Sequence, residues 1–134
     1  MTSAEVVYVD SSGLVKLVVR EPESVQLEQY LQGSSRRVSS ALARVEVVRA
    51  VRGHGAEAVA RARRMLRDVH LVQLDEDLLD GAAELEPLHL RSLDAIHLAT
   101  ARSLGDDLGR LVTYDQRLAA AARAIGLAVD APGS

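Results

Sequence analysis

The sequence of 134 residues contains no cysteine, which excludes several kinds of protein at once. Folds stapled by disulfides, zinc sites built on thiolates and cysteine nucleophiles all need this residue. Aromatic residues are scarce as well, with three tyrosines and neither tryptophan nor phenylalanine. We therefore expect a core of leucine, valine and alanine, and we do not expect nucleic-acid bases to be held by stacking on aromatic side chains.

The net charge and the hydropathy exclude further classes of protein. The formal net charge of −3 excludes a general basic coat for nucleic acid, although a local basic patch is compatible with it. No apolar run approaches the roughly 20 residues that a membrane-spanning helix needs, and residues 1–10 lack the features of a signal peptide. We expect a cytoplasmic protein without membrane contact, with one domain over residues 1–130 and a flexible tail over residues 131–134.

Short runs rich in β-branched residues alternate with amphipathic helical patterns along the chain. The expected strands are residues 5–9, 36–39, 69–74, 110–114 and 127–129. The expected helices begin after Asp10, near Pro22, after Ser39 or Ser40, at Ala56, after Asp75, after Ser92 and after Asp115. Ser11 or Ser12 is the expected cap of the first helix. The alternation predicts an α/β fold, a three-layer α/β/α sandwich around a central, mostly parallel sheet.

Four carboxylates occupy positions at which such a sheet would collect them. Asp10 follows the first expected strand and Asp115 ends the fourth, while Asp94 opens a helix and Glu46 lies within an apolar one. Ligands of open parallel sheets bind beyond the C-terminal ends of the strands. Crowded carboxylates raise one another's pKa, and a divalent ion such as Mg²⁺ or Mn²⁺ removes this penalty. The set therefore predicts a phosphodiester hydrolase that uses an activated water and no side-chain nucleophile.

Each of these residues also has a purely structural interpretation. Asp10 and Asp115 can be helix N-caps, and Asp94 can complement a helix dipole. Glu46 can pair with Arg49, three residues further along the same helix. His97, three residues after Asp94, is either a catalytic base or, as is more common, a packed histidine bonded to backbone or to a carboxylate.

Basic residues are concentrated in one part of the chain. Residues 36–67 contain nine arginines and two acids, which gives this segment a charge of about +7 within an acidic protein. The segment is either a wall that contacts phosphates or a solvated helix face. Arg49 and Arg52 are the best candidates for contact with a nucleic acid, because they follow Glu46 on one helix.

Four segments resemble, in this order, the motif blocks of PIN-domain ribonucleases, and most of all those of VapC-type toxins. The segments are VVYVDSSGLVKL, VSSALARVEVVRAV, LRSLDAIHLATA and LVTYDQRLAAAARAIGL. The block LDAIHLATA followed by TYD is the most distinctive. The resemblance extends over nearly the whole chain and implies a PIN-like α/β sandwich.

The resemblance also implies an activity and a set of site residues. It implies an Mg²⁺-dependent endoribonuclease toxin of a toxin–antitoxin pair, with Mn²⁺ as a possible substitute. Four residues match the family's acidic quartet: Asp10, Glu46, Asp94 and Asp115. Of these, Asp10, Asp94 and Asp115 would bind the metal, and Glu46 would position or deprotonate the attacking water. Ser12 and Thr113 match positions whose hydroxyls support the site. The implied partners are RNA, a VapB-like antitoxin, and a second copy of the chain or a toxin–antitoxin hetero-oligomer.

One position departs from the pattern, because some PIN nucleases carry a further acid where this chain has Arg117. Asp115 therefore lacks the support of a neighbouring acid, which argues against a stable second metal ion. A non-catalytic RNA-binding or antitoxin-binding protein of the same fold is the alternative. A receiver-like phosphoacceptor domain is disfavoured, because it needs a lysine late in the chain and the only lysine is Lys16.

Overall fold

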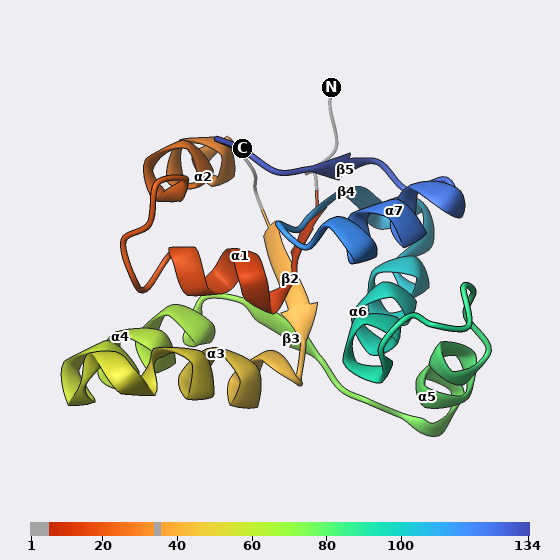
Figure 1. The fold of residues 1–134 in the computed structure, drawn as a ribbon, viewed down its shortest axis with the longest axis horizontal. Coiled ribbons are helices and arrows are strands. Elements are labelled where there is room, and N and C mark those ends of the chain that lie inside the picture. The colour runs from red at the N-terminus through yellow and green to blue at the C-terminus, as the bar shows by residue number, and fades with distance from the viewer. Residues whose placement is uncertain (1–5, 34–35) are drawn as a thin grey trace.

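A computed structural model describes residues 6–33 and 36–134 of the chain. Within these residues five strands alternate with the helices (Figure 1). The strands are β1 (Val6–Val9), β2 (Arg36–Ser40), β3 (His70–Val72), β4 (Leu108–Val112) and β5 (Val129–Asp130). The helices are α1 (Ser11–Lys16), α2 (Ser24–Gln32), α3 (Ala43–Val51), α4 (Ala56–Arg67), α5 (Glu76–Ala83), α6 (Ser92–Ser103) and α7 (Gln116–Ala124). Two short 3₁₀ helices, η1 (Arg52–His54) and η2 (Gly105–Asp107), precede α4 and β4.

The strands form one sheet in the order β3-β2-β1-β4-β5, and every pairing is parallel. The chain builds β1, β2 and β3 towards one edge and then returns to add β4 and β5 on the other side of β1. Strand order therefore reverses between β1 and β4, which is where ligands of open parallel sheets bind. Tyr8 of β1 is paired with Val38 of β2 and with Leu111 of β4, so β1 is the central strand.

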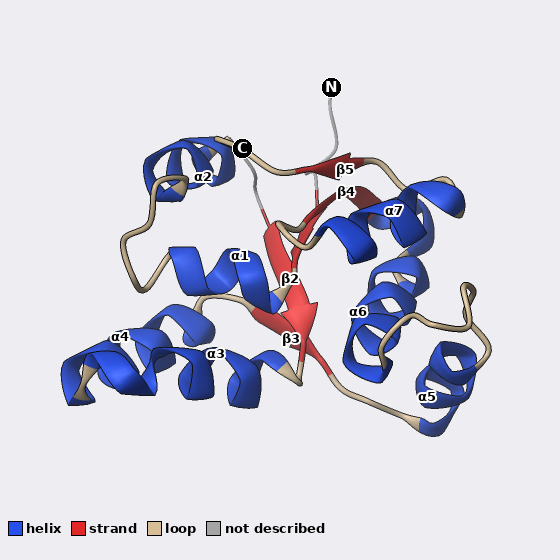
Figure 2. Cartoon of the chain, viewed as in Figure 1, coloured by secondary structure: helices blue, strands red, loops and turns tan. Residues whose placement is uncertain are grey.

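Alternate residues of β1 face two separate cores. Val7 and Val9 pack with residues of α1, α2, α3 and α4, whereas Val6 and Tyr8 pack with residues of α5, α6 and α7. Figure 2 shows the two sets of helices on opposite sides of the strands. The predicted three-layer sandwich and its core of leucine, valine and alanine are thereby confirmed.

The boundaries of four strands differ from the expectation because pairing decides them, and β2 ends at Ser40, one residue later than expected. β3 is limited to three residues, since it pairs only with Val38–Ser40 of β2. β4 begins two residues earlier than expected, and β5 is shifted to pair with Leu111 and Val112. Glu5, the first residue of the expected strand 5–9, lies outside the described residues.

Three of the expected helix caps are wrong. Asp10, and not Ser11 or Ser12, caps α1, because its carboxylate accepts a hydrogen bond from the Gly13 N–H at 3.1 Å. The other two corrections concern α3 and α6, whose N-cap residues are Leu42 and Arg91, neither with a side-chain bond. Asp75 and Asp115 cap α5 and α7 as expected.

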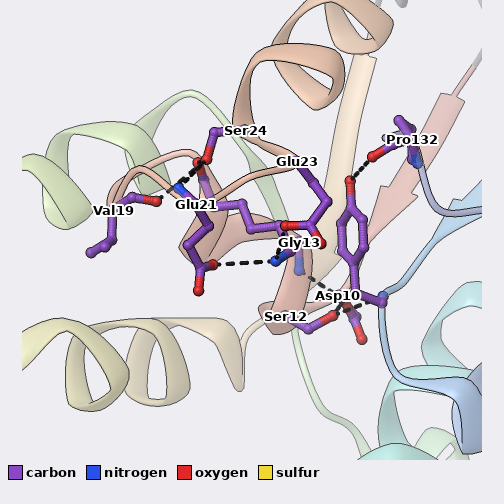
Figure 3. A network of polar contacts seen from close by, with 10 residues as sticks. Asp10, Ser12, Gly13, Val19, Glu21, Glu23, Ser24 and Pro132 are labelled. Atoms are coloured by element: carbon purple, nitrogen blue, oxygen red, sulfur yellow. Dashed lines mark hydrogen bonds and ion pairs between the residues drawn. The ribbon is translucent and has the colours of Figure 1, made fainter. Parts of the chain in front are cut away.

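The last four residues, expected to form a flexible tail, lie near α2 (Figure 1). The Tyr114 hydroxyl donates to the Pro132 carbonyl at 2.8 Å (Figure 3). A Cβ atom added at Gly133 would stand 3.0 Å from Cβ of Gln26 in α2. These contacts place the segment, while its flexibility and the single-domain boundary at residue 130 stay predictions. Among the helices of the described residues, none combines the length and apolar character that crossing a bilayer requires.

Candidate active site

Asp10 lies where β1 ends and α1 begins, at the point of strand reversal. It is 4% exposed, and both of its carboxylate oxygens are held by the protein. Oδ1 accepts from the Ser12 hydroxyl at 2.6 Å and from the Gly13 N–H at 3.1 Å (Figure 3), and Oδ2 accepts from the Thr113 hydroxyl at 2.6 Å. Burial raises the pKa of Asp10, and the hydrogen bonds from Ser12 and Thr113 oppose this effect.

The two hydroxyls tie the β1–α1 junction to the segment that follows β4. Ser12 Oγ accepts from the Tyr114 N–H at 3.1 Å, and Thr113 Oγ1 accepts from the Asp115 N–H at 3.0 Å. Each hydroxyl therefore accepts from backbone on one side and donates its single proton to Asp10 on the other. The orientation of the Asp10 carboxylate is thus fixed jointly by its neighbours in the β1–α1 junction and by Thr113, which is 103 positions away.

Asp115 caps α7 through one carboxylate oxygen. Oδ1 accepts from the N–H groups of Arg117 and Leu118, at 2.8 and 3.2 Å. Oδ2 has no hydrogen-bond partner among the described residues. The cap interpretation is therefore confirmed, and the second oxygen is left available for another role. The exposed Arg117 contributes its backbone N–H to this cap.

Asp94 lies half-buried in the first turn of α6. Burial raises the pKa of this carboxyl, and the charges of Asp115 and Asp10 raise it further, while His97 and Arg91 oppose them. Like charges have this effect only over short distances. The charges of Asp115 and Asp10 are therefore near enough to act on Asp94, although the three aspartates belong to three different segments.

Glu46 of α3 is bound by a second pair of partners. Its Oε1 accepts from the Ser11 hydroxyl and from Nε2 of His97, both at 2.7 Å. Burial alone would raise the pKa of Glu46, but the bonds from His97 and Ser11 outweigh it, and the pKa is lowered. The structural alternative for Glu46, a pair with Arg49, is not what the structure shows, since the ion-pair partner of Glu46 among the described residues is His97.

His97 is 3% exposed and bonded to a carboxylate, which confirms its interpretation as a packed histidine. It nevertheless lies among the candidate site residues, because its Nε2 is bonded to Glu46 and lies 3.4 Å from the hydroxyl oxygen of Ser11. The sequence predicts no role for Ser11 beyond capping a helix and none for Tyr8. The position of His97 one helical turn after Asp94 is the one signal that pointed to this part of the site.

The acidic residues do not form a closed cluster of metal ligands. No group of three or more histidine, aspartate or glutamate side chains within residues 6–33 and 36–134 has the arrangement to hold a metal ion. What the structure brings together is a buried Asp10, an adjacent Asp94 and Asp115, and a Glu46 held by His97. All potential donors on these acids are oxygen atoms, which is the donor set that Mg²⁺ and Mn²⁺ prefer. The roles of these residues as ligands stay predictions.

Arg49 and Arg52 are exposed, on α3 and at the start of η1. Together with other side chains of α3 and α4 they line a surface groove of about 350 Å³, which we call the arginine groove. Its lining consists of Arg44, Val45, Val48, Arg49, Arg52, Val59 and Arg63. The local basic patch expected from the sequence thus lies on the helix that carries Glu46.

Comparisons with known proteins place the chain in a family and agree with this fold. The sequence model of the PIN domain matches residues 7–124. Ribonuclease VapC46 of Mycobacterium tuberculosis is 55% identical over 126 residues, which cover 94% of this chain and 97% of that protein. The chain belongs to the PIN-domain family and, within it, to the VapC ribonucleases. The resemblance seen in the four sequence motifs is thereby confirmed.

Solved structures show the same fold at low sequence identity. The crystal structure of Mycobacterium tuberculosis VapC20, described as a toxin that cleaves the sarcin–ricin loop, matches with a TM-score of 0.75 and 17% identity over 94% of this chain and 99% of that chain. A toxin–antitoxin complex from Klebsiella pneumoniae matches with a TM-score of 0.67 and 21% identity, over 83% and 88% of the two chains. At these identities the likeness concerns the fold.

Proposed function

We propose that the protein is a metal-dependent endoribonuclease toxin that hydrolyses RNA phosphodiester bonds with an activated water. Its membership among the VapC ribonucleases supports the reaction class. The observation that carries the location of the reaction is the buried Asp10 at the reversal of strand order, joined to the Asp115 backbone through the Thr113 hydroxyl, and the raised pKa of Asp94 agrees with it. Aspartates that repel one another at the switch point of a parallel sheet favour the binding of a cation there.

Asp10, Asp94 and Asp115 are the proposed metal ligands. Enzymes of this family generally use divalent metal ions, and we propose Mg²⁺, with Mn²⁺ as a substitute, because the available donors are all oxygens. When bound, the ion lowers the pKa of a water molecule and stabilises the charge on the leaving oxygen. Ser12 and Thr113 would support the site by holding Asp10 in one orientation, through the bonds described above.

Glu46 is the proposed group that orients the attacking water or removes its proton. Its Oε1 is already held by Ser11 and His97, whereas Oε2 has no hydrogen-bond partner among the described residues. A lowered pKa keeps Glu46 ionised, and an ionised carboxylate oxygen accepts a hydrogen bond from water. A carboxylate that is fixed at one oxygen and open at the other suits this role.

The proposed partners are RNA and a small antitoxin. Arg49 and Arg52 would contact the RNA backbone, because guanidinium groups match phosphate oxygens and the arginine groove carries no acidic side chain. The Klebsiella pneumoniae neighbour is a toxin–antitoxin complex, which supports a VapB-like antitoxin as the second partner. A homodimer or a toxin–antitoxin hetero-oligomer that acts in the cytoplasm completes the proposal.

Cleavage of RNA by the purified protein tests this function. We expect cleavage with Mg²⁺ or Mn²⁺, none with excess chelator, and products with 5′-phosphate and 3′-hydroxyl ends, since water and not the ribose 2′-hydroxyl attacks. Asp94→Asn should lower the rate by at least about 100-fold, because the ion supplies several kcal/mol of transition-state stabilisation.

Asp77→Asn, at an exposed acid of α5, is the matched control and should leave the rate unchanged. Full activity of Asp94→Asn would refute the assignment of the site. Retention of RNA without cleavage, together with no heat of Mn²⁺ binding in calorimetry, would favour the non-catalytic alternative.

A further inference from the structure

A line of hydrogen bonds runs from the core of the sheet to Glu46. The hydroxyl of Tyr8, a residue of β1 that is 0% exposed, lies 2.6 Å from Nδ1 of His97. On the other side of the imidazole, Nε2 lies 2.7 Å from Oε1 of Glu46. The tyrosine and histidine rings meet edge to face, with centroids 5.9 Å apart and planes at 75°. Both nitrogens of a buried histidine are thus used, one by the core and one by the candidate active site.

For a neutral imidazole, the two bonds together restrict where the protons lie. An ionised glutamate is only an acceptor, so Nε2 of His97 must carry the proton that joins them. In a neutral imidazole Nδ1 is then an acceptor, and the Tyr8 hydroxyl is the donor to it. Burial raises the pKa of Tyr8, with a smaller contribution from the charge of Asp10, so this hydroxyl keeps its proton. The Tyr8 bond therefore selects the tautomer that donates to Glu46.

The hydrogen bonds from the protein restrain Oε1 of Glu46, and Oε2 has no hydrogen-bond partner among the described residues. Oε1 receives a second bond from the Ser11 hydroxyl at 2.7 Å, so two donors from two segments restrain the carboxylate. The Glu46 side chain is 24% exposed, whereas that of His97 is 3% exposed. The restraint therefore comes from the interior, and the open face of the carboxylate is turned towards the surface.

We infer that Tyr8 and His97 are positioning residues, which hold the Glu46 carboxylate in the orientation that the reaction uses. The inference rests on the proposed function, in which Glu46 acts on the attacking water. Tyr8 and His97 act only through Glu46, Tyr8 by fixing the tautomer of the ring and His97 by donating to Oε1. Side-chain partners of this kind typically change activity by about 10- to 100-fold when they are removed.

The tautomer is tested by ¹⁵N NMR of the histidine-labelled protein, which needs no activity. We expect the wild-type His97 ring to carry a proton on Nε2. Tyr8→Phe keeps the ring packing and removes the hydroxyl, so it should allow the Nδ1-protonated tautomer to appear at His97. A proton on Nδ1 or an unprotonated Nε2 in the wild type, or an identical His97 signal in Tyr8→Phe, would overturn the inference.

The effect on the reaction is tested by a double-mutant cycle with Glu46. His97→Leu should lower kcat for RNA cleavage by about 10- to 100-fold with little change in KM. His97→Gln restores a donor and should recover part of the loss. The double variant Glu46→Gln/His97→Leu should be no slower than Glu46→Gln alone, because His97 acts through that carboxylate. His70→Gln, at an exposed histidine of β3, should match the wild type.

The outcomes separate this inference from the proposed function. Multiplicative losses in the double variant, or a kcat of His97→Leu within about twofold of the wild type, would overturn the inference while RNA cleavage stood. Thermal unfolding of each variant identifies any that fail to fold, and in that case Tyr8→Phe and His97→Gln decide the matter. A wild-type protein that cleaves no RNA with any divalent ion would overturn the proposed function and the positioning role with it, whatever the NMR result.

Discussion

Replacing Thr113 by valine should destabilise the protein in a way that depends on the ionisation of Asp10. The Thr113 hydroxyl is buried, donates to Oδ2 of Asp10 at 2.6 Å and accepts from the Asp115 N–H at 3.0 Å. Valine has nearly the same shape but neither function. The change therefore leaves a buried carboxylate oxygen and a backbone N–H without their partners.

The expected loss follows from the nature of these bonds. A hydrogen bond to a charged group contributes about 1.5–3 kcal/mol, and Asp10 is too deeply buried for water to replace it. We expect Thr113→Val to lower the free energy of unfolding by about 2–4 kcal/mol at neutral pH, including the orphaned N–H. Thr113→Ser keeps the hydroxyl and removes one methyl group, so it should cost about 1 kcal/mol.

The destabilisation caused by Thr113→Val should be larger at neutral pH than at acid pH. The pKa of Asp10 is already raised in the folded protein, and loss of the Thr113 bond raises it further, because that bond favours the ionised form. The extra destabilisation is therefore complete only above the folded-state pKa of Asp10 in Thr113→Val, because the pKa of Asp10 in the unfolded chain is the same for both variants and cancels in the comparison. It declines as the pH falls and Asp10 takes up a proton in the folded state.

Urea unfolding of both variants at several pH values measures this effect. At neutral pH we expect the midpoint for Thr113→Val to lie about 1 M below that for Thr113→Ser. Equal midpoints for the two variants, or a difference that is the same at acid and neutral pH, would refute the reasoning, because the hydroxyl would then make no contribution specific to the ionised carboxylate.

Two further predictions concern neighbouring residues of the site. Gly13→Ala would place a Cβ atom 2.7 Å from Cγ1 of Val9 and should lower the free energy of unfolding by about 1–3 kcal/mol. Gly53→Ala is the control and should be tolerated, because no atom lies within 4 Å of the added Cβ. Equal thermal unfolding of the two variants would contradict this prediction. Asp115→Asn removes the charge that, after burial, contributes most to the raised pKa of Asp94. In metal-free protein the pKa of Asp94 should fall towards the ordinary value of about 3.9, as followed by ¹³C NMR of the carboxyl groups, and an unchanged pKa would show that the two carboxylates do not interact.

Much of the fold followed from local pattern. The run from Val6 to Val9 between polar residues predicted a buried strand, and aspartates after strands predicted two helix starts that the structure confirms. Sequence periodicity also placed α4 at the residues the structure gives it. The caps of α3 and α6 were wrong because a serine near a helix start is only one of several residues that can occupy that position, and the path of the entering chain selects among them.

The sequence pattern could not predict which side chains of the site contact one another. Thr113 and Asp10 are bonded across 103 positions, and Tyr8 and His97 across 89. Motif resemblance identified Thr113 as a supporting hydroxyl, but nothing in the sequence showed that it also accepts from the Asp115 N–H. The alternative partner that the sequence suggested for Glu46 failed for the same reason, since Arg49 is near in sequence and His97 is near in space.

The sequence by itself determined the α/β architecture and named the acidic residues, because hydrophobic periodicity and residue type are properties of short segments. Only the tertiary structure decided how those residues are held. The reversal of strand order beside β1 brings α1, β4, α3 and α6 together, and that arrangement assigns each hydroxyl and imidazole proton to a particular carboxylate. Hydrogen bonds require atoms within about 3 Å of one another, a condition that depends on the packing of the whole sheet.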